Sequence, residues 1–308
     1  MSRAHVVGGG RHDGLHDRWT LLDSAGQSVS ADQLIADVSA ALGFENPQPL
    51  TQGGQKLVLK GTLSGAPAVA KIVLLSPGPN GDITLKRAHR EVELLSAVDS
   101  PRVVKVLTDA VEIGDPPSAV CWAEEWLDGE DLADSLKRTW GEPEIWTLLG
   151  DVSEALSACH DLDVVHRDLS PRNVRAMPEG RFVLMDPGLA RHLMKSALTG
   201  GFQPGTPGWR SPEHVLGGDP VPASDIFALG ILAYYAVTGE FPIDPNGSTG
   251  DYDHALKTQQ APAISSVAPW ISSELGQVVD RCLNRQPARR YLDGAELKMA
   301  LDDLEAHR

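Results

Sequence analysis

The stretch Val164-Val165-His166-Arg167-Asp168-Leu169-Ser170-Pro171-Arg172-Asn173-Val174 sets the organisation of this chain. It places an acid, Asp168, five residues before an amide, Asn173, in a short loop bounded by apolar pairs. A second acid, Asp186, ends another apolar run, and Gly180 lies midway between Asn173 and Asp186. A glycine at that place predicts a hairpin of two short strands, whose closure brings Asn173 and Asp186 together.

This predicted convergence suits a magnesium ion. The amide oxygen of Asn173 and the carboxylate of Asp186 are hard oxygen ligands of the kind that Mg²⁺ takes, usually alongside phosphate and water. Asp168 would lie beside the metal without binding it. Its carboxylate is therefore expected to accept a proton from a reacting group.

A buried ion pair is predicted upstream of this loop. The apolar strand 66–75 carries one lysine, Lys71, which shares a strand face with Val69 and Val73. In the segment 85–95, apolar residues recur at steps of three and four, which predicts a helix with one buried stripe, and Glu91 lies on that stripe. A buried carboxylate needs a cation, so Glu91 is expected to pair with Lys71. The alternative is an edge lysine whose ammonium reaches solvent.

These motifs resemble, in their order and spacing, those of the protein kinases, and the resemblance covers roughly residues 50–305. His166-Arg167-Asp168 with Asn173 is similar to the catalytic loop of that family. Asp186-Pro187-Gly188 stands where the family has Asp-Phe-Gly. Residues 205–213 resemble the end of the activation segment.

The resemblance implies an α+β, two-lobed fold with a small antiparallel β-sheet lobe containing one helix and a larger, mainly α-helical lobe. The expected kinase domain is 45–305, with a small lobe at 45–124, a hinge at 125–129 and a large lobe at 130–305. Residues 1–44 would form an N-terminal extension, partly disordered, with one helix that Ser30 begins and that spans 31–42. That helix is expected either to pack on the small lobe or to dock a partner.

The resemblance also assigns roles for phosphoryl transfer from ATP with Mg²⁺ or Mn²⁺. Asp168 is the expected proton acceptor, Asn173 and Asp186 are the metal ligands, Lys71 anchors the phosphates and Glu91 positions Lys71. Residues 51–58 occupy the place of the phosphate-covering glycine-rich loop, where glycine lets backbone N–H groups approach phosphate. The expected nucleotide-binding residues are Thr51, Gly53, Gly54, Lys56, Val58, Val69, Lys71, Glu125, Leu127 and Asp186.

Two further contacts and one switch follow from family positions. Glu213 is expected to pair with Arg290, and Asp225 to brace the backbone of the catalytic loop, in addition to lying in the first turn of a helix capped by Ser224. Arg167 is expected to meet a phosphate on the activation segment or, alternatively, a nearby carboxylate. The hydroxyls that would carry such a phosphate are Ser196, Thr199 and Thr206, of which Thr199 is the best placed and Thr206 the poorest.

The match has four departures from the family pattern. Ser170 stands where serine/threonine kinases usually carry a lysine that contacts phosphate, and Arg172, two residues later, is expected to take over that contact. Pro187 replaces the usual phenylalanine, and Arg175 stands where an apolar residue normally forms the floor of the adenine site. The glycine-rich loop keeps only Gly53 of its three glycine positions. By the same alignment, Glu124 guards the back of the nucleotide site, where a neutral side chain is usual.

Three functions remain open on the sequence. The chain is expected to be a protein kinase, and Thr206 favours serine or threonine acceptors over tyrosine. The departures allow a pseudokinase that acts as a binding scaffold. A small-molecule kinase of the antibiotic-phosphorylating kind would share the catalytic loop, but that class usually lacks the 205–213 segment and the Glu213/Arg290 elements.

Composition limits the partners and the location. The chain has 308 residues and a formal net charge of -15, which argues against general affinity for nucleic acid or anionic membranes. Protein substrates are the expected partners. The three cysteines are far apart and have no metal-ligand spacing, as in a reduced, cytoplasmic protein. The longest apolar run, 226–237, is too short to span a bilayer and predicts a buried helix.

The remaining segments have less specific patterns. Residues 1–30 show little periodicity and are expected to be mostly disordered. The segments 101–107 and 119–123 are apolar and predict the last two strands of the small sheet. An apolar stripe at 145–159 predicts a helix that leads into the catalytic loop, and the last two helices are expected at 271–283 and 292–304.

Overall fold

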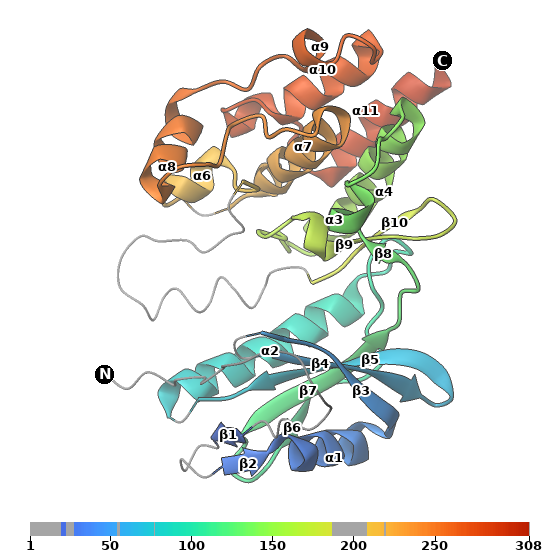
Figure 1. Cartoon of the computed structure of the whole chain (residues 1–308), viewed down its shortest axis with the longest axis vertical. Helices are drawn as coiled ribbons and strands as arrows, with labels where there is room; N and C mark the ends of the chain where they lie inside the picture. The colour runs from blue at the N-terminus through green and yellow to red at the C-terminus, as the bar shows by residue number, and fades with distance from the viewer. Residues whose placement is uncertain are drawn as a thin grey trace.

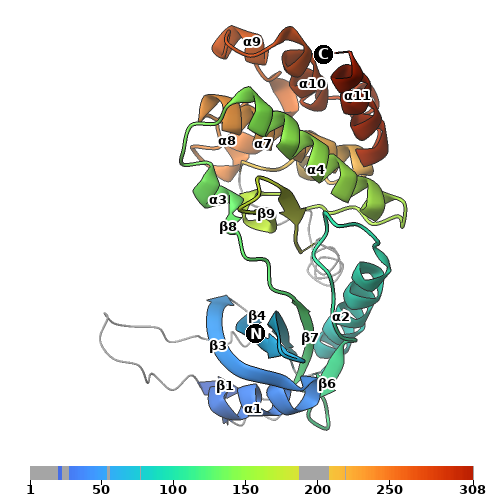
Figure 2. The same ribbon diagram turned by 90° about the vertical axis from the view of Figure 1, so that its right-hand side faces the viewer.

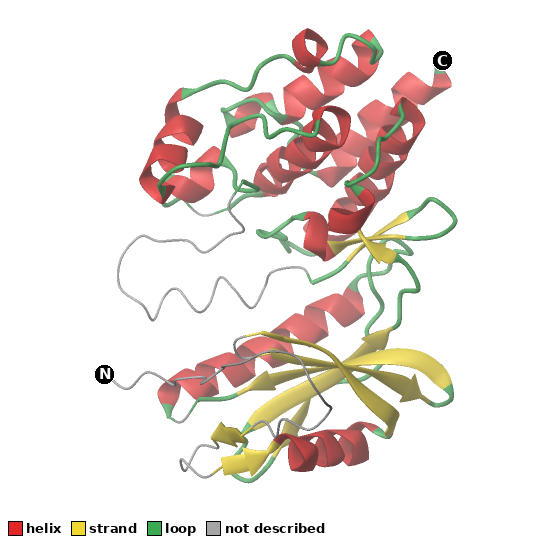
Figure 3. Cartoon of the chain, in the orientation of Figure 1, coloured by secondary structure: helices red, strands yellow, loops and turns green. Residues whose placement is uncertain are grey.

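The computed structural model describes residues 20–22, 28–53, 56–76, 78–186, 208–218 and 220–307. A five-stranded sheet with two helices occupies one end of the molecule, and helices make up most of the other end (Figures 1 and 3). This is the two-lobed α+β architecture that the sequence predicted.

The small lobe is built on an antiparallel sheet with the strand order β3-β4-β5-β7-β6. The central strand, β5, pairs with β4 from Ala66 to Val73 on one side and with β7 from Ala68 to Leu74 on the other. The strands are β3 (Phe44–Gly53), β4 (Lys56–Leu63), β5 (Ala66–Leu74), β6 (Val111–Ile113) and β7 (Ala119–Glu125).

The two faces of this sheet are covered by different helices. α1 (Ala31–Leu42) packs its buried leucine and valine side chains against the face that carries Ala68, Ala70 and Ile72 of β5. α2 (Pro79–Ala97) packs against the opposite face, which carries Val73 of β5. In Figure 2, α1 lies beneath the sheet at the end farthest from the large lobe. The predicted alternation of β5 is therefore confirmed, and Lys71 faces the α2 side.

The N-terminal part is more regular than the sequence suggested. α1 spans the predicted residues, and its apolar stripe is buried on the small lobe and so is not open to a partner. Two short antiparallel strands, β1 (Thr20–Leu22) and β2 (Ser28–Ser30), precede it within a region that shows no clear periodicity.

The strand predicted at 101–107 is wrong. This segment makes only isolated bridges, one between Val103 and Leu184 and one between Val106 and Glu124. Its backbone therefore runs from the large lobe to the sheet and cannot pair with a single strand. The edge strand that pairs with β7 is β6 instead.

The large lobe surrounds two buried helices, α4 (Glu142–His160) and α7 (Pro222–Thr238), whose apolar side chains belong to one core. Both helices lie on the apolar segments from which they were predicted. The other helices of this lobe within the described residues are α3 (Leu132–Ser135), η1 (Pro171–Asn173), α6 (Pro212–Val215), α8 (Thr249–Thr258), α9 (Ile264–Val267), α10 (Ser273–Cys282), η2 (Pro287–Arg289) and α11 (Gly294–Ala306).

A small three-stranded sheet lies on the side of the large lobe that faces the small lobe (Figure 1). Its strands are β8 (Glu130–Asp131), β9 (Val174–Ala176) and β10 (Phe182–Leu184), in the order β10-β9-β8. β9 and β10 form the predicted hairpin, and Gly180 has a φ of 80° in its turn, a conformation that glycine adopts without strain. Among the described residues, no helix is both long and apolar enough to cross a membrane.

Candidate active site

The loop between α4 and η1 is fixed by a carboxylate from α7. Asp225 accepts hydrogen bonds from the backbone N–H groups of His166, at 2.7 Å, and Arg167, at 2.8 Å. Burial raises the pKa of Asp225, but the contact with His160, the charge of His166 and the Arg167 N–H outweigh burial and hold that pKa below its ordinary value. Asp225 is therefore an ionised anchor for the loop, as the sequence predicted.

The predicted helix cap at Ser224 needs a correction. α7 begins earlier, at Pro222, and Val221 precedes it as the N-cap. Ser224 lies inside the first turn, where its hydroxyl accepts from the Val221 N–H at 3.1 Å and donates to Glu213 at 2.7 Å. A proline at the first helical position favours this earlier start, because its missing N–H costs nothing there.

Asp168 and Asn173 lie side by side. The Asn173 Nδ2 group donates to the backbone oxygen of Asp168 at 2.8 Å and lies 3.4 Å from the Asp168 carboxylate. Arg167 has a φ of 68°, an uncommon conformation for a residue with a side chain, and this turn precedes Asp168 directly. The N–H of Met185 donates to the Asn173 oxygen at 2.8 Å, so the β9–β10 hairpin brings Asp186 next to Asn173.

The donor set at this point fits a hard cation. Asp186 contributes a carboxylate, and Asn173 contributes an amide oxygen because its amide nitrogen is already bonded to Asp168. Carboxylate and amide oxygens are the ligands that Mg²⁺ prefers. The two predicted metal ligands are therefore neighbours of suitable chemistry.

Lys71 reaches this site from the small lobe. Its ammonium forms ion pairs with Asp186 and with Glu124, the latter at 2.5 Å. Burial lowers the pKa of Lys71, but the charges of Asp186 and Glu124 outweigh burial and raise that pKa above its ordinary value. Lys71 therefore stays charged and joins the two lobes.

The partners of Lys71 differ from the predicted one. Glu91 is buried on the inner face of α2, as its position in the apolar stripe predicted. Within the described part of the chain, however, the ion pairs of Lys71 go to Glu124 and Asp186 and not to Glu91. Glu124 pairs with Lys71 because strand register puts both side chains on the same face of the sheet, whereas Glu91 lies on a separate element, α2. The sequence drew attention to Glu124 only as an unusual residue at the back of the nucleotide site.

The predicted nucleotide residues within the described part of the small lobe lie on β3, β4 and β5 and on the connection to the large lobe. Val58 pairs across the sheet with Lys71, and Val69 is two residues away on the same strand, so the three share a face. Glu125 donates its N–H to the Lys105 oxygen at 2.9 Å, and Leu127 is buried. In the turn region, Thr51 and Gly53 lie on β3 and Lys56 on β4, while Gly54 lies outside the described residues.

Arg175 makes contacts that the sequence did not predict. Its guanidinium pairs with Asp131 at 2.6 Å and lies 6.0 Å from the Trp126 ring, whose centre is 3.7 Å from the Lys60 ammonium. The signal in the sequence was the arginine itself, at a place where the family has an apolar residue. These side chains gather beside the connection between the lobes.

Two further predicted site residues, Arg167 and Arg172, lie in and just after the catalytic loop. Arg172 is exposed on η1, two residues beyond Ser170, which is buried. Arg167 is half-buried. Ser196, Thr199 and Thr206 lie outside the described residues, and so does Pro187.

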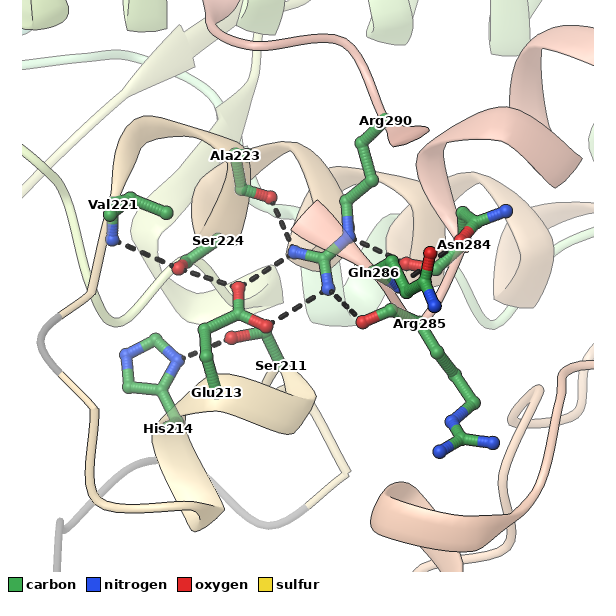
Figure 4. Close-up of polar contacts among 10 residues, drawn as sticks. All are labelled: Ser211, Glu213, His214, Val221, Ala223, Ser224, Asn284, Arg285, Gln286 and Arg290. Carbon is green, nitrogen blue, oxygen red and sulfur yellow. Dashed lines mark hydrogen bonds and ion pairs between the residues drawn. The ribbon is translucent and has the colours of Figure 1, made fainter. Parts of the chain in front are cut away.

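The segment after the activation region is tied to the lobe by the predicted fork. Arg290 donates two parallel hydrogen bonds to the Glu213 carboxylate, at 2.7 and 2.9 Å, as Figure 4 shows. Such a bidentate pair fixes both distance and orientation. Glu213 on α6 is therefore held against η2 and the start of α7.

Comparison with known proteins gives a consistent result. Residues 44–298 match the family model described as "Protein kinase domain". The chain is 32% identical over 288 residues to serine/threonine-protein kinase pkn2 of Myxococcus xanthus, covering 89% of this chain and 33% of that protein. It is 32% identical over 225 residues to PknA of Corynebacterium glutamicum, covering 70% of this chain and 46% of that protein.

A solved structure supports the same fold. The kinase domain of PknI from Mycobacterium tuberculosis superimposes with a TM-score of 0.60 at 22% identity, over 86% of this chain and 98% of that one. The match to the family model spans the sheet, the catalytic loop and the Glu213–Arg290 fork. The chain therefore belongs to the protein kinase domain family.

Proposed function

We propose that this chain transfers the γ-phosphoryl group of ATP to serine or threonine hydroxyls of protein substrates. The observation that carries the proposal is the meeting of Asp168, Asn173, Asp186 and Lys71 where the two lobes join. Two acids, an amide and a buried ammonium are the groups that phosphoryl transfer from ATP uses. The bacterial relatives are named serine/threonine-protein kinases, which supports the serine/threonine class of acceptor.

In the proposed reaction, Asp168 accepts the proton of the acceptor hydroxyl. The hydroxyl oxygen forms a bond to the γ-phosphorus, and the bond from that phosphorus to the bridging oxygen breaks, so that ADP leaves with the electron pair. Lys71 would bind phosphate oxygens of the nucleotide. Asn173 and Asp186 would hold a Mg²⁺ ion, which would supply positive charge against the phosphates. Most of the catalytic effect would come from positioning and charge neutralisation.

ATP as donor suits the cytoplasm, which we infer as the location. All three cysteines are free and buried, and burial raises their pKa values, so none is a reactive thiolate. Unpaired cysteines are usual in a reducing compartment.

The test is incubation of the purified chain with labelled ATP, Mg²⁺ and a panel of protein substrates. We expect Asp168→Asn to lower the rate of transfer by about 10²- to 10⁴-fold, because the acceptor loses its base. ATP affinity should persist, because Asp168 acts on the acceptor. Asp163→Asn, an exposed acid in the turn before the same loop, serves as the matched control. A wild-type chain that binds ATP without transferring phosphate would overturn the proposal in favour of a scaffold.

A further inference from the structure

Glu124 and Lys71 are brought together by the register of two central strands. In the antiparallel pair of β5 and β7, Lys71 lies opposite Trp122 and Val69 lies opposite Glu124. Opposite residues point to the same face of a sheet, and residues two apart on a strand share that face. Glu124 is therefore the diagonal neighbour of Lys71, within reach of a long side chain.

The carboxylate of Glu124 is held from both sides in a buried position. Its Oε2 atom lies 2.5 Å from the Lys71 Nζ atom, and its Oε1 atom accepts a hydrogen bond from the Trp122 indole N–H at 2.8 Å. Glu124 is only 3% exposed, and Trp122 is fully buried. A buried carboxylate that is bonded through both oxygens has little freedom to leave its cation.

Glu91, by contrast, lies on a different element from Lys71. α2 rests on the sheet through Ala88 and Val92, which pack against the face that carries Trp122. A shift of α2 would move Glu91 relative to Lys71. The same shift would leave the backbones of Glu124 and Lys71 in the same relative position, because the hydrogen bonds between β5 and β7 fix them.

We propose that Glu124 is the residue that positions Lys71 for the phosphates of ATP, in the place that the resemblance gives to Glu91. The inference rests on the proposed function only in taking ATP as the ligand of Lys71. When nucleotide binds, Lys71 exchanges its contact with Asp186 for phosphate oxygens and keeps its contact with Glu124. Orientation of Lys71 then does not depend on where α2 lies.

Steady-state kinetics with a peptide acceptor compare Glu124→Gln with Glu91→Gln. We expect Glu124→Gln to lower kcat/KM for ATP by about 10²-fold, with a raised KM for ATP, because a displaced lysine binds phosphate poorly. The loss of kcat/KM for ATP in Glu91→Gln should be at least tenfold smaller than the loss in Glu124→Gln. A variant that merely folds poorly would lose kcat through a smaller active fraction and keep its KM. Glu112→Gln and Glu93→Gln, two exposed glutamates on β6 and α2, are the matched controls.

Binding of Mg²⁺-ADP, measured by calorimetry, tests the inference without turnover. We expect Glu124→Gln to weaken ADP binding in the wild-type background and to have no further effect in a Lys71→Met background, because Glu124 acts through Lys71. Equal effects in both backgrounds would overturn the inference, as would a larger loss for Glu91→Gln in either assay. If the wild-type chain binds ADP and shows this coupling but transfers no phosphate, the proposed function fails while the role of Glu124 stands.

Discussion

Replacement of Arg290 by methionine should destabilise the large lobe strongly. The Arg290 side chain is fully buried, and all five of its N–H donors are used. Two go to Glu213, and the other three go to the backbone oxygens of Ala223 at 2.8 Å, Asn284 at 2.6 Å and Arg285 at 3.0 Å (Figure 4). Methionine keeps much of the volume and removes every one of these bonds.

The size of the effect follows from what remains after the change. Glu213 would stay largely buried without its cation, and removal of one partner of a buried ion pair costs about 3–5 kcal/mol. For a folding unit of about 150–250 residues, a loss of 1 kcal/mol in the free energy of unfolding lowers Tm by about 2–4 °C. We therefore expect Arg290→Met to lower Tm by about 6–20 °C at pH 7.

The assay is thermal unfolding followed by circular dichroism, with Arg289→Met as the control because Arg289 is the exposed neighbour on η2. The pH dependence of Tm is a second measurement. Burial raises the pKa of Glu213, but the hydrogen bonds and charge of Arg290 outweigh burial, so this pKa lies below its ordinary 4.5. The stabilisation is thus complete above about pH 4.5 and is lost as the pH falls through the lower, folded-state pKa.

The difference in Tm between wild type and Arg290→Met should therefore narrow as the pH falls below about 4.5. If Arg290→Met unfolds within about 2 °C of the Arg289→Met control at pH 7, the fork does not carry the stability that its geometry implies. A difference in Tm that is constant from pH 7 to pH 4 would also contradict the argument, because it would show that the charge of Glu213 does not contribute to the stability of the fork.

Three further substitutions test other parts of the structure. Asp186→Ala should remove the strengthening of ATP binding by Mg²⁺, because it deletes the proposed carboxylate ligand. A thermal-shift titration of ATP with and without Mg²⁺ checks this, and an unchanged Mg²⁺ effect would refute the ligand role. Gly294→Ala should destabilise the chain by roughly 1–3 kcal/mol in urea unfolding, because an added Cβ would lie 2.3 Å from the Ser157 nitrogen of α4. Gly150→Ala, on α4 with open space around its Cβ position, should stabilise by about 0.5–1 kcal/mol, and equal effects of the two alanines would show that α4 and α11 do not pack as closely as described.

Local patterns predicted the parts of the site that lie on one element or one hairpin. The apolar runs around Gly180 predicted the hairpin that joins Asn173 to Asp186, since a turn between two short strands leaves little freedom in how its ends meet. The alternation along β5 likewise placed Lys71 on the inner face. The Glu213–Arg290 fork was predicted from the order of family motifs, because the two residues are 77 positions apart and no local pattern relates them.

The partner of Lys71 depended on packing and was not predicted. Both Glu91 and Glu124 are carboxylates near the right position, and the choice between them depends on strand register and on where α2 rests. The strand expected at 101–107 failed for a similar reason. An apolar segment that passes from one lobe to the other has the composition of a strand, while its hydrogen bonds go to Leu184 in one lobe and Ala123 in the other.

The position of α1 has a consequence for where this kinase domain begins as a folding unit. The match to the family model starts at residue 44, just after α1 ends at Leu42. Without α1, the outer face of the sheet would present Ala68, Ala70 and Ile72 to water as a continuous apolar strip. Strips of this kind promote association between copies. A chain cut at the family boundary would therefore lose part of its own core. We propose that residues 31–43 belong to the folded domain and are not a tail attached to it.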